Sequence, residues 1–217
     1  MVLEGIDGSG TTTQAERYAQ HLRAQRRLVH VTHEPSTGPI GTQIRLVLRQ
    51  RLMMPATHQP EAMALLFAAD RLDHVAAEID PLLRDGYVVL SDRYDLSSLA
   101  YQSITAAQVS TDAPPSQRVT TATVEWIREL NRFARRPHVT VVLDVSPNVA
   151  ASRRRSRGGV AEMYEEAELQ ARLAEAYKRA EDLLPNDRII HIDGDRSPDI
   201  VAAAIEEALR PFVSPRS

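Results

Sequence analysis

The stretch Gly5-Ile6-Asp7-Gly8-Ser9-Gly10-Thr11-Thr12 follows a short apolar run, Val2-Leu3, and precedes a helical pattern that begins at about Thr12. Glycines at this spacing let successive backbone N–H groups converge on a phosphate group, and the positive end of the following helix favours a bound anion. A hydroxyl group at the last position can ligate Mg²⁺. The stretch therefore predicts a phosphate-binding loop (P-loop) between a buried strand and a helix.

One position of this loop departs from the usual pattern. Where P-loops carry a lysine that contacts the phosphates, this sequence has Thr11, which cannot neutralise a phosphate oxygen. A glycine-rich turn between a strand and a helix can also be purely structural. The loop alone therefore leaves both interpretations open.

Short apolar runs of strand length alternate with longer segments in which apolar residues recur at every third or fourth position. This alternation predicts an α/β fold with a parallel five-stranded sheet flanked by helices, because a right-handed crossover through a helix joins parallel strands. Ligands of such sheets bind at the carboxyl ends of the strands. The predicted strands are Val2-Leu3, Leu28 to Thr32, Tyr87 to Ser91, Val139 to Val145 and Ile189 to Ile192.

The chain of 217 residues has the size of one domain and contains no repeat or low-complexity linker. We expect an exposed loop from Thr105 to Gln117, which contains Pro114 and Pro115. The first apolar run is shorter than the usual strand of about five residues. We therefore expect the natural chain to begin upstream of Met1.

Composition limits the classes of partner and location. The net charge of −3 gives no reason to expect a nucleic acid or a membrane as a partner, and no apolar run approaches the roughly 18 residues of a membrane span. We expect no signal peptide, because no basic region followed by an apolar core opens the sequence. The absence of cysteine excludes disulfides and fits a cytoplasmic location.

Two further segments carry charged side chains that suit phosphate transfer. Asp92 and Arg93 end a predicted strand, where an acid can position a metal ion and a planar guanidinium can bind an acceptor phosphate. The segment from Ser152 to Gly159 contains four arginines followed by two glycines, which suits a mobile lid over a transferring phosphoryl group. The plain alternatives are a solvated strand end and a solvated basic face.

Five segments, in their order and spacing, resemble bacterial thymidylate kinases, which are P-loop nucleoside monophosphate kinases. They are Glu4 to Gly10, His33-Glu34-Pro35, Leu66 to Arg71, Ser91 to Tyr94 and Ser97 to Gln102, and the resemblance runs from about Val2 to about Phe212. It implies a single P-loop kinase domain, 1–217, with a small arginine-rich lid at about 152–165. It also implies a homodimer packed through helices and transfer of the ATP γ-phosphoryl group to dTMP.

The resemblance implies a role for each matching residue of the acceptor site. Phe67 stacks on thymine, Arg71 hydrogen-bonds to the O4 edge of the base, and Tyr101 fills the space that a 2′-hydroxyl would need. Arg93 binds the acceptor phosphate. The same site is expected to include Glu34, Ser98 and Gln102.

For catalysis we expect positioning and charge to provide most of the rate, with ATP and Mg²⁺ bound at the P-loop. The loop without lysine resembles family members whose catalytic basic residue lies in the lid, where Glu162 and Glu165 match the acidic positions that follow the arginines. The predicted catalytic residues are Asp7, Asp92, Arg93, Arg153 and Arg157, and the predicted metal ligands are Thr12 and Asp92. The predicted ATP-binding residues are Gly5, Ile6, Asp7, Gly8, Ser9, Gly10, Thr11 and Thr12.

Two other functions remain open from the sequence. A kinase that acts on another nucleoside or nucleoside monophosphate would not need Phe67, Arg71 and Gln102 together. A nucleotide-binding protein that lost turnover with its P-loop lysine would have no use for a lid of arginines.

Overall fold

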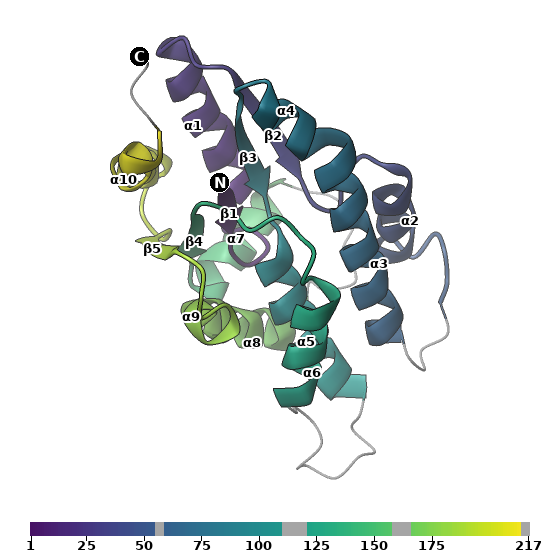
Figure 1. Ribbon diagram of the computed structural model, residues 1–217. Helices are drawn as coiled ribbons and strands as arrows, with labels where there is room; N and C mark the ends of the chain where they lie inside the picture. Colours follow the sequence, from purple (N-terminus) through teal and green to yellow (C-terminus); the bar gives the residue numbers. More distant parts are fainter. Residues whose placement is uncertain (55–58, 110–120, 158–165, 214–217) are drawn as a thin grey trace.

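The computed structural model describes residues 1–54, 59–109, 121–157 and 166–213 (Figure 1). Its centre is a sheet of five parallel strands in the order β2-β3-β1-β4-β5. The predicted sheet is therefore confirmed, and the ends of its strands differ from the apolar runs by one residue at most. The strands are β1 (Val2–Glu4), β2 (Val29–His33), β3 (Val88–Asp92), β4 (Thr140–Asp144) and β5 (Ile189–Asp193).

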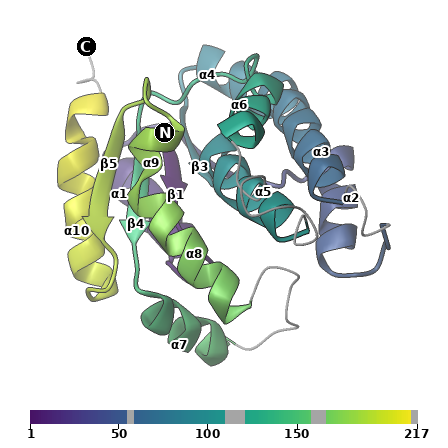
Figure 2. The same ribbon diagram turned by 90° about the horizontal axis from the view of Figure 1, so that it is seen from below.

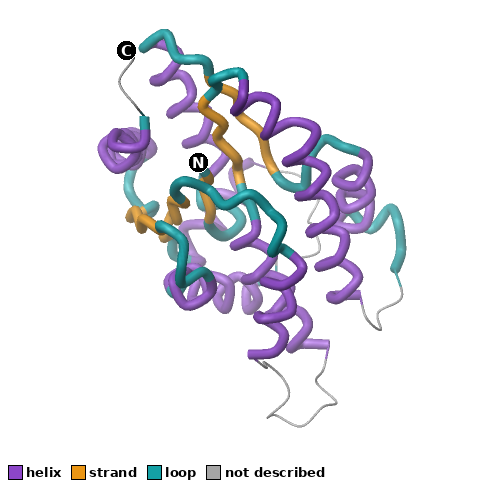
Figure 3. Tube along the Cα trace, in the orientation of Figure 1, coloured by secondary structure: helices purple, strands orange, loops and turns teal. Residues whose placement is uncertain are grey.

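Helices surround these strands (Figure 3). Residues from Met63 to Leu82 lie on one helical path, because α3 continues through a π-helix into α4. The helices are α1 (Thr11–Ala24), α2 (Pro39–Leu48), α3 (Gln59–His74), the π-helix η1 (Val75–Ile79), α4 (Asp80–Arg84), α5 (Asp95–Val109), α6 (Thr121–Leu130), α7 (Pro147–Arg157), α8 (Ala167–Lys178), α9 (Ala180–Leu183), α10 (Pro198–Leu209) and the 3-10 helix η4 (Arg210–Phe212).

The helices form layers on both faces of the sheet. Strands β4 and β5 lie between α10 on one side and α8 and α9 on the other (Figure 2). Helix α1 packs against β1, β2 and β3 and beside α10, while α3, α5 and α6 pack on one another. Within the described ranges, no helix combines the length and the apolar character that crossing a membrane requires.

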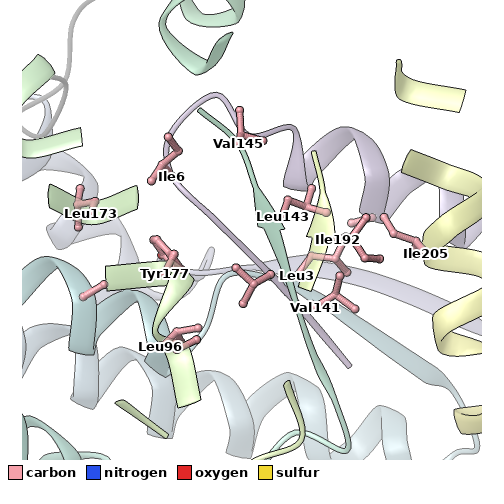
Figure 4. Close-up of a cluster of buried hydrophobic side chains, with 14 of the residues drawn as sticks. Leu3, Ile6, Leu96, Val141, Leu143, Val145, Leu173, Tyr177, Ile192 and Ile205 are labelled. Carbon is pink, nitrogen blue, oxygen red and sulfur yellow. The ribbon is translucent and has the colours of Figure 1, made fainter. Parts of the chain in front are cut away.

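Strand β1 is short but lies at the centre of the sheet and the core. Leu3 of β1 pairs in register with Val141 of β4 and with Asp92 of β3. Figure 4 shows Leu3 between Ile205 of α10 and Tyr177 of α8, so the middle of the sheet is covered on both faces. The loop that follows β1 therefore opens at the centre of the carboxyl edge of the sheet.

The prediction of an exposed loop from Thr105 to Gln117 is wrong for residues 105–109. Helix α5 continues to Val109. No proline precedes Pro114 in this stretch, and the Thr105 hydroxyl donates to the Tyr101 carbonyl oxygen at 2.8 Å within the helix. The remaining residues of the expected loop, 110–117, lie outside the described residues.

Candidate active site

The P-loop turns tightly between β1 and α1. Gly8 and Gly10 have φ angles of 91° and 96°, a left-handed conformation that favours glycine. A Cβ atom at Gly8 would lie 2.5 Å from the carbonyl oxygen of Ala150 in α7. Because glycine stands there, the loop packs directly on α7, the helix that carries the predicted lid arginines.

The other loop residues divide between the core and the site. The side chain of Ile6 is buried in the hydrophobic core (Figure 4). The backbone N–H of Ser9 donates to the Ile6 carbonyl at 3.0 Å and closes the turn. Thr11 is the first residue of α1 and is buried without a charge that could replace the usual lysine.

The two predicted metal ligands lie side by side. Thr12, in the first turn of α1, donates its hydroxyl proton to Oδ2 of Asp92 at the end of β3. The second carboxylate oxygen of Asp92, Oδ1, is buried and has no hydrogen-bond partner among the described residues. Mg²⁺ is usually held by one or two protein oxygens together with substrate phosphates and water. This pair therefore fits Mg²⁺, although the described ranges hold no cluster of three His, Cys, Asp or Glu side chains.

Arg93 turns its side chain back over the P-loop. Its φ angle of 71° is uncommon for a residue other than glycine, and its backbone N–H donates to the Leu3 carbonyl at 2.9 Å. Nη1 donates to the carbonyl oxygen of Gly5 at 2.9 Å, and Nη2 forms an ion pair with the Asp7 carboxylate. Two predicted catalytic residues, Asp7 and Arg93, are thus brought together.

One hollow beside the P-loop is lined by all the predicted acceptor-binding residues. Aromatic and apolar walls with a few converging polar groups are typical of a site for a small ligand. The predicted residues in its wall are Glu34, Phe67, Arg71, Arg93, Ser98, Tyr101 and Gln102, with Asp7 on the side of the P-loop. The wall also contains Pro35, Leu48, Tyr94 and Ser97, for which the sequence motifs predict no role.

Arg71 is buried in the wall of this hollow and is held from three directions. Its Nη2 pairs with Glu34 at 2.6 Å and donates to Ser98 Oγ at 3.2 Å, while Nη1 donates to the side chain of Asn131. Burial alone would lower the pKa of Arg71. The charge of Glu34 and other nearby groups raises the pKa by more than burial lowers it, so the pKa lies above its ordinary value. Its Nε is buried without a hydrogen-bond partner among the described residues, which leaves one donor for a ligand oxygen.

Two partners of this cluster are not predicted by the sequence motifs. Asn131 comes from 60 residues further along the chain, and no local pattern marks it. His74 lies three residues after Arg71 on α3, a spacing that places both on one helix face. Its Nδ1 is 3.3 Å from Glu34 Oε1, and its Nε2 is 2.7 Å from the Thr32 hydroxyl.

A second hollow runs along the rest of the P-loop. Its walls are Gly8, Ser9 and Gly10, the start of α1, part of α7 and the segment between β5 and α10. Arg153 of α7 donates to the Ser9 carbonyl at 3.2 Å and to the Gly194 carbonyl at 2.8 Å. The P-loop contributes to both hollows, so ligands bound in the two would meet at this loop.

Two arginines of α7, Arg153 and Arg154, lie against the P-loop. Arg154, for which the motifs predict no individual role, donates to the Asp7 carbonyl oxygen, and Arg155 is exposed. Helix α7 ends at Arg157, whose side chain lies outside the described residues. Residues 158–165 of the predicted lid, with Glu162 and Glu165, also lie outside them.

Glu4, the last residue of β1, is a fully buried carboxyl group directly before the P-loop. It accepts hydrogen bonds from the backbone N–H groups of Tyr94 at 2.7 Å and Ser97 at 3.2 Å. The hydroxyls of Ser97 and Tyr177 also donate to it, at 2.7 Å and 3.1 Å. Burial raises the pKa of Glu4 to about 7, because loss of solvation outweighs the opposing effects of Arg93 and the hydrogen bonds.

Comparison with known proteins gives one consistent family. The family model described as "Thymidylate kinase" matches residues 3–205. A protein of Pyrobaculum aerophilum called "Probable thymidylate kinase" is 37% identical over 215 residues, which covers 98% of this chain and 97% of that protein. A protein of the same name from Pyrococcus abyssi is 36% identical over 213 residues, covering 96% and 97%. These relatives are mostly archaeal, so they indicate the family and not its bacterial branch.

The raised pKa of Glu4 predicts how stability depends on pH. Its folded pKa of about 7 lies above the ordinary value of 4.5, so the folded state retains a proton that the unfolded state releases between these values. The free energy of unfolding should therefore fall as pH rises through this window, by about 3 kcal/mol for this group. Urea unfolding between about pH 5 and about pH 8 measures the decline.

The matched control is Glu4→Gln, which has no titrating group at this position. Its free energy of unfolding should decline less steeply over the same pH range. Parallel curves for the two proteins would contradict the assignment of this titration to Glu4.

Proposed function

Because the chain belongs to the thymidylate kinase family, we propose that it transfers the γ-phosphoryl group of ATP to dTMP with Mg²⁺, giving dTDP and ADP. The observation that carries the proposal is the hollow in which Phe67, Arg71, Tyr101 and Gln102 come together beside the P-loop. Members of the family are nucleoside monophosphate kinases, and this chain is one of them. The proposal concerns its substrates, its metal and the role of each residue.

The wall of the hollow suits a thymine base. Phe67 offers an aromatic face for stacking. The unpartnered Nε of Arg71 can donate to a carbonyl oxygen such as O4 of thymine, and it would repel the amino group of cytosine. Gln102 has a buried Oε1 without a hydrogen-bond partner among the described residues, which can accept the N3–H of the base. Ser98 and Glu34 hold Arg71 in this direction.

The sugar and the phosphate of dTMP would lie next to the base, toward the P-loop. The ring of Tyr101 is buried in the wall, with the guanidinium carbon of Arg93 5.4 Å from its centre. This ring occupies the space next to the sugar that an added 2′-hydroxyl would need. Arg93 then binds the acceptor phosphate, and its ion pair with Asp7 keeps it beside the P-loop.

The P-loop holds the donor. Its backbone N–H groups and the start of α1 would bind the phosphates of ATP, and the second hollow would take the nucleoside. Thr12 and Asp92 would hold Mg²⁺, which when bound neutralises charge on the phosphate oxygens. Transfer then depends on holding the acceptor oxygen and the γ-phosphorus in line, with little covalent chemistry by the protein.

We further propose that the single domain 1–217 has its lid at about 152–165 and uses lid arginines in place of the P-loop lysine, as in the bacterial branch of the family. Arg153 and Arg154 support this because both reach carbonyl oxygens of the P-loop. Arg153 and Arg157 are the residues assigned to the γ-phosphoryl group. Guanidinium groups stabilise the charge of a transferring phosphoryl group without proton transfer.

We also propose a cytoplasmic homodimer that binds neither nucleic acid nor membranes. Four large apolar side chains are exposed around two helices that pack on each other, α3 and α6. They are Leu65 and Leu72 of α3, Trp126 of α6, and Phe133 just beyond α6. Exposed apolar side chains that gather in one region are typical of protein interfaces. The net charge of −3 and the absence of cysteine support the remaining points.

Release of ADP with dTMP, dUMP, CMP and thymidine as acceptors tests the function. We expect dTMP to be the best acceptor, with CMP and thymidine near the background rate, because Arg71 selects a carbonyl oxygen and Arg93 needs a phosphate. A preference for CMP or thymidine would indicate a different kinase. Calorimetric binding of dTMP and ATP without ADP release would indicate a nucleotide-binding protein without turnover.

Tyr101 should exclude ribonucleotides. We expect wild type to prefer dTMP over the same nucleotide with a 2′-hydroxyl, Tyr101→Phe to keep this preference, and Tyr101→Ala to relax it by about tenfold. The measurement is kcat/KM for both acceptors with each protein. Equal discrimination in Tyr101→Ala would remove the steric role.

Loss of the P-loop lysine should make Arg153 unusually important. We expect Arg153→Ala to lower kcat by roughly one to two decades, the effect of one charge-assisted contact of about 1.5 to 3 kcal/mol. Thr11→Lys should leave kcat unchanged or raise it. The assay uses saturating Mg-ATP and dTMP.

Arg155→Ala is the matched control, because it removes a positive charge from the exposed side of the same helix. An equal loss in Arg155→Ala would show that only the general charge of α7 matters. Urea unfolding of Arg153→Ala separates loss of rate from loss of stability. An inactive wild type that Thr11→Lys restores would identify a lapsed kinase.

The proposed dimer contact should break when a charge enters the exposed apolar face of α3. Sedimentation analysis of Leu65→Glu should show a monomer where wild type is a dimer, because an unpaired buried charge destabilises the interface. Ile200→Glu is the control, since Ile200 is similarly exposed but lies on α10. A monomeric wild type, or dissociation by Ile200→Glu alone, would contradict this interface.

A further inference from the structure

The guanidinium of Arg93 also contacts the hydroxyl groups of Ser97 and Tyr177, which lie outside the P-loop. Its Nη1 donates to Ser97 Oγ at 3.1 Å and to the hydroxyl of Tyr177 at 3.2 Å. The same two hydroxyls donate to Oε2 of Glu4. The two hydroxyls also lie 2.9 Å from each other, so the buried carboxyl group of Glu4, both hydroxyls and the guanidinium of Arg93 form one connected hydrogen-bond network.

The direction of these hydrogen bonds follows from the chemistry of the groups. A guanidinium only donates and an ionised carboxylate only accepts, whereas each hydroxyl has one proton and two lone pairs. When Ser97 and Tyr177 give their protons to Glu4, their lone pairs face Arg93. Burial raises the pKa of Tyr177 well above its ordinary value, so its hydroxyl keeps the proton that this arrangement needs.

The three groups are held by different elements of the fold. Glu4 ends β1, Ser97 lies in the first turn of α5, and Tyr177 lies near the end of α8. The ring of Tyr177 is buried in the hydrophobic core near Leu96 and Leu173 (Figure 4), so its hydroxyl has a fixed position. The guanidinium of Arg93 is thus held by groups whose own positions are fixed by other elements of the fold.

We propose that Glu4, Ser97 and Tyr177 are positioning residues, which hold the guanidinium of Arg93 in the direction that binds the acceptor phosphate. This inference rests on the proposed function. A role in stability alone fits the geometry less well. A fully buried carboxyl group is costly, and both hydroxyls that it orders contact Arg93, which reaches the P-loop and also lines the hollow that contains Arg71.

Steady-state kinetics separates orientation from folding. In Tyr177→Phe we expect kcat/KM for dTMP to fall by roughly tenfold, the effect of one hydrogen bond to a charged group. KM for ATP should stay within about twofold of wild type. Ser97→Ala should act in the same direction. Glu4→Gln should lower kcat/KM for dTMP more than either of these variants. Its amide group would donate to both hydroxyls and so turn their protons toward Arg93.

Two controls and one combination make the test specific. Tyr18→Phe and Ser103→Ala remove buried hydroxyls of the same kinds from α1 and α5 outside this network, and should leave dTMP kinetics unchanged. Combining Tyr177→Phe with Arg93→Ala should add little to the loss caused by Arg93→Ala, because the hydroxyl acts through that arginine. Urea unfolding shows whether each variant is folded. If Glu4→Gln does not fold, the Tyr177→Phe and Ser97→Ala variants are enough to test the inference.

The outcomes separate this inference from the proposed function. A wild type without dTMP-dependent ADP release overturns the proposed function and this inference with it. A wild type that phosphorylates dTMP, with an unchanged Tyr177→Phe, overturns the inference alone. A Tyr177→Phe variant whose kinetics are impaired equally for ATP and dTMP also overturns it. So does a loss of kcat/KM for dTMP in Tyr177→Phe that adds in full to the loss caused by Arg93→Ala.

Discussion

The pairing of β1 with β3 is the constraint on which the site depends. The register places Leu3 opposite Asp92, so the P-loop and the Asp92-Arg93 segment leave neighbouring strands at the same level. Thr12 can then donate to Asp92, and Arg93 can reach the carbonyl oxygen of Gly5. A shift of one residue in this register would turn Asp92 to the other face of the sheet and separate both pairs. The P-loop and the Asp92-Arg93 segment are therefore aligned by backbone hydrogen bonds, before any side chain contributes.

Around this frame the protein keeps several charged groups out of water. Arg71 and Glu34 are buried in the wall of the hollow beside the P-loop. Glu4 is buried too, and it accepts hydrogen bonds from Tyr94 and Ser97 of the same wall. Such groups are costly to bury, and the partners around each one hold it in a single direction in return. Glu4 illustrates the conflict between stability and orientation. Its protonated form is the more favourable one in the folded state up to about pH 7, whereas its ionised form orders the hydroxyls that face Arg93.

The P-loop has no lysine, and arginines of α7 bring positive charge next to it. Thr11 brings no charge to the loop, but Gly8 lets α7 pack so closely that Arg153 and Arg154 reach its carbonyl oxygens. Close packing and positive charge are therefore supplied by the same contact. Both guanidinium groups donate to backbone carbonyl oxygens of the loop, so neither occupies a backbone N–H group. A lysine would have projected from the loop itself, whereas arginines on a separate helix can act only when that helix is in place.

The sequence by itself determined the strands, the P-loop and most of the residues that line the hollow beside this loop. Apolar runs mark buried strands, glycine spacing marks the loop, and the motif residues Phe67, Arg71 and Gln102 all reach one wall. Only the tertiary structure decided which partners hold them. Asn131 lies 60 residues from Arg71 and Tyr177 lies 173 residues from Glu4, and no local pattern encodes such pairs. The structure also shows that α5 continues to Val109. The sequence predicted a loop from Thr105 because of the prolines further along the chain. The physical reason is that periodicity reports which face of an element is buried, whereas hydrogen-bond partners depend on how separate elements pack.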